Sequence, residues 1–341
     1  MTDSPQFPVP LVLAPLAGFT NAAFRRLCSR RGATLTFTEM VSAAGLVHGS
    51  SATRQLLELL PGEGPVVCQI FGRNPDELAF ATHEVDVLKR TDEGVEAPRF
   101  TAIDLNAGCP MPKIVKEGAG AALLKDPKLV HDCLHAMKSA TSLPVTLKTR
   151  PGPSPDKVLM LELLDAAQSA GCSGFTLHAR FTSQMHSGEV HYDLLAELVQ
   201  AARIPITGNG GVYNRETAEK MAQTGVAAVM IGRAAMANPW IFRDLAEGSA
   251  VEDEHNSDIR RRTLQDDAFR EHLASALELQ ALLAARYPDD HIPDVDSFVS
   301  YILHTQLFRY FNRRQNAAGF RARLAAVHTL AELRELFGDI L

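Results

Sequence analysis

The strongest constraint on the fold is a repeated alternation of short apolar runs with longer helical patterns. Eight runs rich in β-branched residues predict strands at Val9–Ala14, Thr34–Thr38, Val66–Ile70, Thr101–Asn106, Val145–Thr149, Gly174–His178, Ile204–Thr207 and Ala227–Ile231. Helix-like stretches follow, for example Asp76–Lys89, Leu129–Ser139, Leu159–Ala170, Tyr192–Ala202 and Arg215–Gln223. Eight strand–helix units that close after about 240 residues favour a TIM (β/α)8 barrel over a doubly wound open sheet.

The chain changes character near Glu247, where Glu252, Asp253 and Glu254 indicate a polar linker. The rest of the chain is rich in helix formers and holds few β-branched runs and little glycine. A chain of 341 residues is long enough for one large domain and a small one. We therefore predict an α/β barrel over residues 1–247 and a small all-α helical domain over residues 255–341.

The cysteines and the N-terminus bound the cellular setting. Five scattered cysteines without a CxxC pair argue against a disulfide framework and a zinc site, and favour a reducing cytoplasm. The N-terminus shows no basic region followed by an apolar one, and no apolar run reaches membrane-spanning length. We expect a cytoplasmic monomer with no membrane partner and no metal.

Polar side chains and glycine turns follow nearly every predicted strand. Since the active sites of TIM barrels lie at the carboxyl ends of the strands, these residues should meet at one mouth. A barrel with a purely structural role would not need them. In chain order they are Ala14 to Gly18, Gln69, Asn106 with Cys109 beyond it, Lys148 and Arg150, His178 and Arg180, Gly208 to Gly211, and Gly232 with Arg233.

Several of these strand ends suit a phosphorylated ligand. Gly210, Gly211 and Gly232 let the backbone approach an anion closely, and Arg233 adds a charged donor. The alternative is that the glycines only turn the chain, but both loops lie where barrels commonly bind phosphate. Lys148 could stabilise negative charge on a reduced flavin, or it could extend to solvent. Gln69 and Asn106 could hydrogen-bond a flavin or uracil, or satisfy local backbone.

Cys109 differs from the other cysteines because it lies in a turn at the barrel mouth. Cys28, Cys68 and Cys133 fall in helical or strand patterns, as packing residues do. An ordinary thiol has a pKa of about 8.5, so it is mostly protonated near neutrality and suits a proton donor better than a nucleophile. His178 has no partner at metal-ligand spacing, which argues against a metal.

Read in chain order, the strand-end motifs resemble the tRNA-dihydrouridine synthase family. The matching stretches are 13–18, 38–40, 69–72, 104–110, 113–124, 147–150, 177–180, 208–211 and 231–234, with a fainter continuation in His304–Arg323. Asn106 to Pro110 is the most specific. The chain departs from the family pattern at Pro151 to Pro153, Ala179, Phe181 and Gly211.

The resemblance implies a TIM barrel that reduces the C5–C6 double bond of particular tRNA uridines, using bound FMN and the co-substrate NADPH. It implies Cys109 as general acid, and Asn106, Arg150 and Arg180 facing the uracil. The residues that it implies for FMN are Pro15, Leu16, Ala17, Gln69, Lys148, His178, Asn209, Gly210, Gly211, Gly232 and Arg233.

A local basic stretch offsets the overall acidity of the chain. The net charge of −6 taken alone speaks against a nucleic-acid partner. Residues 297–331, however, hold no Asp or Glu and contain Arg309, Arg313, Arg314, Arg321 and Arg323. We interpret this stretch as a tRNA-binding surface; the alternative is the solvated face of a helical hairpin, and we expect most of its aromatics to pack in the core.

Two other functions fit part of the pattern. An FMN barrel acting on a small pyrimidine, like dihydroorotate dehydrogenase, explains the barrel but not the acid-free stretch. A catalytically silent RNA-binding barrel explains that stretch but not Lys148 and Cys109 at strand ends.

Overall fold

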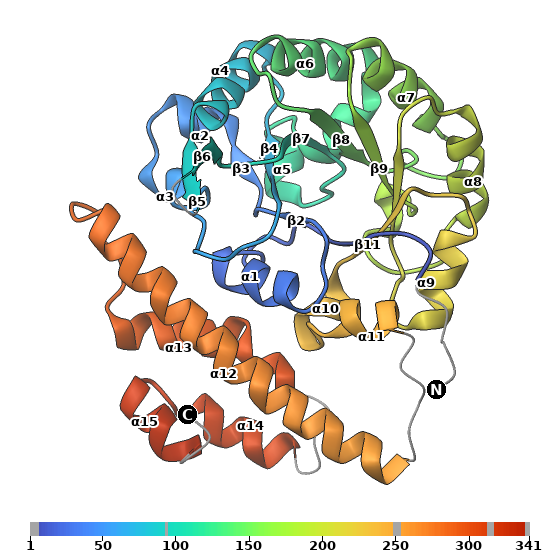
Figure 1. The fold of residues 1–341 in the computed structure, drawn as a ribbon. Helices are drawn as coiled ribbons and strands as arrows, with labels where there is room; N and C mark the ends of the chain where they lie inside the picture. The colour runs from blue at the N-terminus through green and yellow to red at the C-terminus, as the bar shows by residue number, and fades with distance from the viewer. Residues whose placement is uncertain (1–6, 93–94, 248–253, 312–316, 338–341) are drawn as a thin grey trace.

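The computed structural model describes residues 7–92, 95–247, 254–311 and 317–337, which form a barrel followed by helices (Figure 1). The barrel strands are β1 (Leu11–Leu13), β2 (Thr36–Phe37), β4 (Val66–Phe71), β7 (Ala102–Ala107), β8 (Val145–Thr149), β9 (Gly174–His178), β10 (Ile206–Asn209) and β11 (Ala228–Ile231). They pair in parallel in the order β1-β11-β10-β9-β8-β7-β4-β2. The barrel closes where Leu13 N–H donates to the Leu35 carbonyl, at 2.9 Å. The predicted TIM barrel is confirmed.

Helices surround the barrel and cover its strands (Figure 1). They are α1 (Ala22–Arg30), α2 (Ala43–Val47), α3 (Ser51–Gln55), α4 (Pro75–Asp86), α5 (Pro112–Lys116), α6 (Pro127–Ser139), α7 (Met160–Ser169), α8 (Tyr192–Ala201), α9 (Arg215–Ala222), α10 (Arg233–Ala237) and α11 (Ile241–Glu247). The 3-10 turns η1 (Gly120–Lys125) and η2 (Thr182–Gln184) complete the barrel loops. Side-chain caps begin several helices, as when Asn21 accepts from Phe24 N–H at 3.0 Å.

The two-residue period of the strands sorts the barrel core from its mouth. In β8, Val145 and Leu147 pack outward into the main hydrophobic core, which leaves Thr146 and Lys148 inside the barrel. A separate apolar cluster lies inside the barrel and contains Val12, Ala14, Phe37, Val67, Ala102 and Met230, of which Val67 and Ala102 lie at the start of β4 and β7. The polar inward positions therefore collect near the carboxyl ends of the strands.

Two local elements were not predicted. The short strand β3 (Val41–Ser42) pairs with β4, and β5 (Lys89–Asp92) forms an antiparallel hairpin with β6 (Val95–Pro98). The helix predicted to reach Lys89 is wrong at its end, because α4 stops at Asp86. Arg99 N–H donates to the Leu88 carbonyl at 3.0 Å, so the hairpin returns the chain directly to the helix end.

The C-terminal part is helical, as predicted. It consists of α12 (Glu254–Arg286), α13 (Val295–Thr305), the 3-10 turn η3 (Leu307–Phe311), α14 (Ala317–Ala325) and α15 (Leu330–Phe337). The long helix α12 packs against α1 (Figure 1), where Arg26 donates to Ser275 at 2.8 Å and to Glu278 at 2.6 Å. The predicted linker at Glu252 and Asp253 lies outside the described residues, and the domain boundary stays a prediction.

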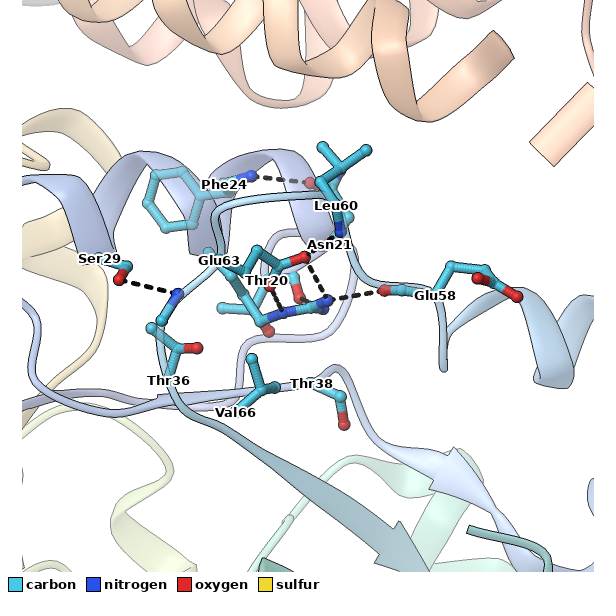
Figure 2. A network of polar contacts seen from close by, with 12 residues as sticks. Thr20, Asn21, Phe24, Ser29, Thr36, Thr38, Glu58, Leu60, Glu63 and Val66 are labelled. Carbon is cyan, nitrogen blue, oxygen red and sulfur yellow. Dashed lines mark hydrogen bonds and ion pairs between the residues drawn. The ribbon is translucent and has the colours of Figure 1, made fainter. Parts of the chain in front are cut away.

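A buried ion pair fastens α1 to the loop before β4. The Arg25 guanidinium, 1% exposed, donates to the Glu63 carboxylate and to the carbonyls of Thr20 and Glu58, each at 2.8 Å. Figure 2 labels these three partners. Burial raises the pKa of Glu63, and the charge of Arg25 opposes that rise. The Glu58 side chain in turn accepts from the Tyr287 hydroxyl at 2.9 Å. This network links the barrel to the far end of α12.

Breaking this pair should be costly. In Arg25→Met, the Glu63 carboxylate stays buried without its cation, so the free energy of unfolding should fall by about 3–5 kcal/mol. Arg54→Met is the matched control, because the Arg54–Glu84 pair is largely exposed and should contribute no more than about 1 kcal/mol. Urea unfolding of both variants measures the difference. Equal losses would show that the buried network does not hold α1 in place.

Candidate active site

A cavity of about 500 Å³ opens at the carboxyl ends of the strands, where the sequence predicted it. The structure brings to its wall all but one of the predicted site residues: Pro15, Leu16, Ala17, Asn106, Cys109, Lys148, Arg150, His178, Arg180, Asn209, Gly210, Gly211, Gly232 and Arg233. Each comes from a strand end or the loop that follows it. The convergence expected of a TIM barrel is therefore present in this chain.

The fully charged side chains of the cavity wall are all cationic. The wall carries five cationic side chains, from Lys148, Arg150, Arg180, Arg233 and Arg309, and no carboxylate is present among the described residues that line it. Uncompensated cations in a partly enclosed cavity attract anions. The site is therefore suited to a ligand with negative charge.

Burial and neighbouring charge set the protonation of two cavity residues. Burial and the nearby Arg150 lower the pKa of Lys148 to about 8, against the pull of the Asp104 charge. The amine is therefore largely protonated at neutral pH, and it donates to Asn209 Oδ1 at 3.2 Å. Burial and the charges of Lys148 and Arg150 hold the pKa of His178 well below its usual range, so His178 is a neutral imidazole.

Arg180 and two glycines form a cradle on one side of the cavity. Arg180 is 4% exposed and donates through Nε to the Gly188 carbonyl at 3.0 Å, while its buried Nη1 has no hydrogen-bond partner in the part of the chain that the structure describes. Gly210 and Gly211 have φ of +117° and +70°, in the region that favours glycine. A Cβ at Gly210 would lie 2.8 Å from the His178 ring and 3.6 Å from Arg180 Nη1. An unpartnered cation beside closely approaching backbone fits an anionic group.

Arg150 braces two cavity loops against each other. Its guanidinium donates to the Gly108 carbonyl at 2.8 Å and to the Phe181 carbonyl at 3.0 Å, and the residue is almost fully buried. Burial lowers the pKa of Arg150 to about 10, which still leaves it charged at neutral pH. The predicted contact with a uracil therefore has to use the part of the guanidinium that these carbonyls leave open.

Gln69 is the predicted residue that does not reach the cavity wall. It is fully buried, and both ends of its amide are engaged: Nε2 donates to Asp104 Oδ2 at 2.7 Å, and Oε1 accepts from Asn106 Nδ2 at 2.8 Å. In this structure, Gln69 is therefore not positioned for direct contact with a cofactor in the cavity. Its inward position in β4 places it one layer below the wall.

These contacts form a chain of hydrogen bonds that ends at Cys109. Asp104 is a buried carboxylate whose other oxygen accepts from the Thr146 hydroxyl at 2.6 Å. Because Asp104 can only accept when ionised, it fixes which way the Gln69 amide points, and Gln69 fixes Asn106. Asn106 Oδ1 then accepts from the backbone N–H of Cys109 at 3.0 Å. Burial raises the pKa of Asp104, whereas the hydrogen bonds from Thr146 and Gln69 and the charge of Lys148 lower it.

Cys109 is the accessible thiol of the protein. It is partly exposed at the cavity, whereas Cys28, Cys68, Cys133 and Cys172 are buried. Its carbonyl accepts from Ala121 N–H at 2.9 Å, which ties the loop to η1. Among the cysteines, a reaction at the cavity can therefore involve only Cys109.

The sequence prediction missed several wall residues, among them Met40, His186, Tyr213 and Arg309. His186 stacks on His178 with 5.9 Å between ring centroids, and its carbonyl accepts from Arg233 at 2.9 Å. His186 lies in the loop between Arg180 and Gly188, which follows a strand end, and this position could have identified it as a wall residue. Arg309 was noted for its charge, but the long-range packing that brings it here leaves no local pattern.

The described residues contain neither a metal-binding cluster nor a membrane-spanning helix. No group of three or more His, Cys, Asp or Glu side chains is arranged to hold a metal ion within them. No helix among them is both long and apolar enough to cross a membrane.

Comparison with known proteins agrees with the sequence resemblance. Residues 12–287 match the family model described as dihydrouridine synthase. The chain is 38% identical over 240 residues to a probable tRNA-dihydrouridine synthase of Treponema pallidum, covering 67% of this chain and 68% of that protein. It is 36% identical to tRNA-dihydrouridine synthase B of Shewanella oneidensis, covering 69% and 70%. A solved dihydroorotate dehydrogenase of Eimeria tenella matches with a TM-score of 0.49 at 13% identity, over 71% of this chain and 80% of that one.

The hydrogen bonds that link Asp104 through Gln69 and Asn106 to Cys109 predict how fast Cys109 reacts. Asp104→Ala removes the acceptor that orients Gln69 and should loosen the Cys109 loop, so iodoacetamide should alkylate Cys109 several times faster. Thr146→Val is the matched control, since it removes the other hydrogen bond of the same carboxylate and leaves the path to Cys109 intact. Alkylation followed by peptide mass spectrometry measures the rate. Equal rates in wild type and Asp104→Ala would refute the link.

Proposed function

The chain belongs to the dihydrouridine synthase family, a family of flavin-dependent oxidoreductases, and from this we propose that it reduces the C5–C6 double bond of particular uridines in tRNA. Bound FMN and the co-substrate NADPH complete the proposal. The observation that carries it is the cavity itself, where five cations without a facing carboxylate surround the accessible thiol. We further propose a monomer that acts in the cytoplasm.

The residues present fit FMN. The positive-φ turn at Gly210 and Gly211, where an added Cβ would fill the space, suits the phosphate, together with Gly232 and Arg233. Lys148 and neutral His178 suit the polar edge of the ring, with Asn209 hydrogen-bonded to Lys148 and residues 15–17 also lining the cavity. When bound, FMN would accept hydride from NADPH and supply hydride to uracil C6.

Lys148 supplies charge where the chemistry needs it. With a pKa of about 8, its ammonium is largely protonated at neutral pH and can stabilise negative charge on the pyrimidine edge of the cofactor. The hydrogen bond to Asn209 holds the amine toward the cavity. His178 adds a hydrogen-bonding ring without adding a further positive charge.

Cys109 supplies the proton in this proposal. Its thiol transfers a proton to uracil C5 as C6 receives hydride, and the resulting thiolate regains a proton from solvent. The charge of the product is then unchanged, since one hydride and one proton enter the ring. The Asn106 hydrogen bond holds the backbone of Cys109, which keeps the thiol at one place in the wall.

The uridine has to leave its stacked position to reach the cavity, at a cost of a few kcal/mol. We assign Asn106, Arg150 and Arg180 to the uracil, because all three line the cavity near Cys109. The acid-free stretch, residues 297–331, would bind the rest of the tRNA. Of its arginines, Arg313 and Arg314 lie outside the described residues, and Arg323 is exposed on α14.

Complementation tests the proposal and the role of Cys109 together. In cells that lack this protein, dihydrouridine should be missing from particular tRNA positions and should return with the wild-type chain. Cys109→Ala should keep bound flavin but lose about 10²–10⁴ of the uridine-reduction rate, as expected when a general acid is removed. Cys133→Ala is a control at a buried cysteine. Unchanged dihydrouridine in the deletion would reject the function, and a near-normal rate in Cys109→Ala would reject the proton donor alone.

A further inference from the structure

Arg309 is the side chain through which the helical C-terminal part reaches the catalytic cavity. It belongs to η3, which packs beside α10, the short helix after β11. Its side chain lines the cavity together with the strand-end residues. The guanidinium carbon lies 5.4 Å from the centroid of the Phe19 ring, which is a cation–π distance. The cavity wall is therefore built from both parts of the chain.

The residues around Arg309 are fixed to the barrel. Gln306 is buried, and its Nε2 donates to the Gly18 carbonyl at 2.9 Å while its Oε1 accepts from Asn21 at 3.4 Å. Tyr310 is fully buried, and its hydroxyl lies 3.0 Å from His272 Nδ1. Arg309 lies between these two anchors, so its backbone has a set position at the rim while its side chain stays exposed.

The charge of Arg309 is available to a ligand. No carboxylate pairs with it among the residues that the structure describes, whereas Arg26 on α1 and Arg31 just after that helix both have acidic partners. The Phe19 ring attracts the guanidinium but does not neutralise it. Arg150 and Arg180 are almost fully buried deeper in the wall, and Arg309 is exposed. The cations of the cavity therefore continue from its interior to its rim.

We propose that Arg309 binds a backbone phosphate of the RNA strand next to the target uridine, and this rests on the proposed function. A uridine that enters the cavity remains joined to its neighbours by phosphates, and these have to cross the rim. A free pyrimidine has no such phosphate. Arg309 is thus a positioning residue that favours a uridine in an RNA chain over a free base, and it acts from a segment distant in sequence from the strand ends.

Salt dependence of RNA binding tests this without requiring turnover. The full-length protein is titrated with an unmodified tRNA transcript between 50 and 200 mM salt, as wild type, Arg309→Met, Arg309→Lys and Arg334→Met. Loss of one phosphate contact should make the slope of log K against log salt shallower by about 0.7–0.9 in Arg309→Met. Arg309→Lys keeps the charge and should keep the slope. Arg334→Met removes an exposed arginine from α15 and should leave the slope unchanged.

Neutral phosphate analogues locate the contact. In RNA hairpins that carry a single methylphosphonate near the uridine, one position should weaken binding to wild type about as much as Arg309→Met does, and should weaken Arg309→Met no further. An unchanged slope in Arg309→Met, an equal change in Arg334→Met, or additive losses at every position would each overturn the assignment. If the wild-type protein reduces uridine normally and Arg309→Met leaves the salt slope unchanged, only the proposed role of Arg309 is refuted. Absence of tRNA binding by wild type would refute the proposed function as well.

Discussion

The structure depends on an electrostatic imbalance at one end of a parallel barrel. Five cations meet there without a carboxylate among the described wall residues, and the nearest buried acid, Asp104, lies behind Lys148 in the barrel. Such a wall is satisfied by an anionic ligand, because unpaired charges held out of water are unfavourable. Burial and the charge of Arg150 lower the pKa of Lys148, and the buried Nη1 of Arg180 has no hydrogen-bond partner among the described residues. The proposed flavin phosphate and RNA phosphates are ligands of the matching sign.

Much of the barrel was predictable from residue patterns, because local sequence determines it. β-branched runs predicted all eight barrel strands, and the carboxyl-end rule predicted from the sequence alone that Lys148, His178 and Gly210 meet at one mouth. The period of two explains why: in β8, Lys148 faces inward because Leu147 packs outward. The hairpin of β5 and β6 was missed because its residues carry no apolar alternation.

The remaining features depend on contacts between distant residues. Gln69 faces into the barrel from within β4, which continues to Phe71, and Asp104 and Asn106 engage both ends of its amide; nothing in the local sequence shows this. Arg150 was expected to face a substrate, and the structure adds a bracing role at the Gly108 and Phe181 carbonyls. Arg309 reaches the cavity from a segment that a hydrogen bond from Gln306 to the Gly18 carbonyl, 288 residues away in sequence, holds against the barrel. Tertiary packing, rather than the local sequence pattern, determines the contacts of these three residues.

The proposed function requires that the cationic wall hold a phosphate next to a flavin ring. The most direct measurement compares the affinity of flavin-free protein for FMN and for riboflavin, which differ by that phosphate. A phosphate bound by Arg233 and the glycine turn should make FMN bind at least about 100-fold more tightly, from two charge-assisted contacts of about 1.5 kcal/mol each. Equal affinities for the two flavins, or no binding of either, would contradict the account.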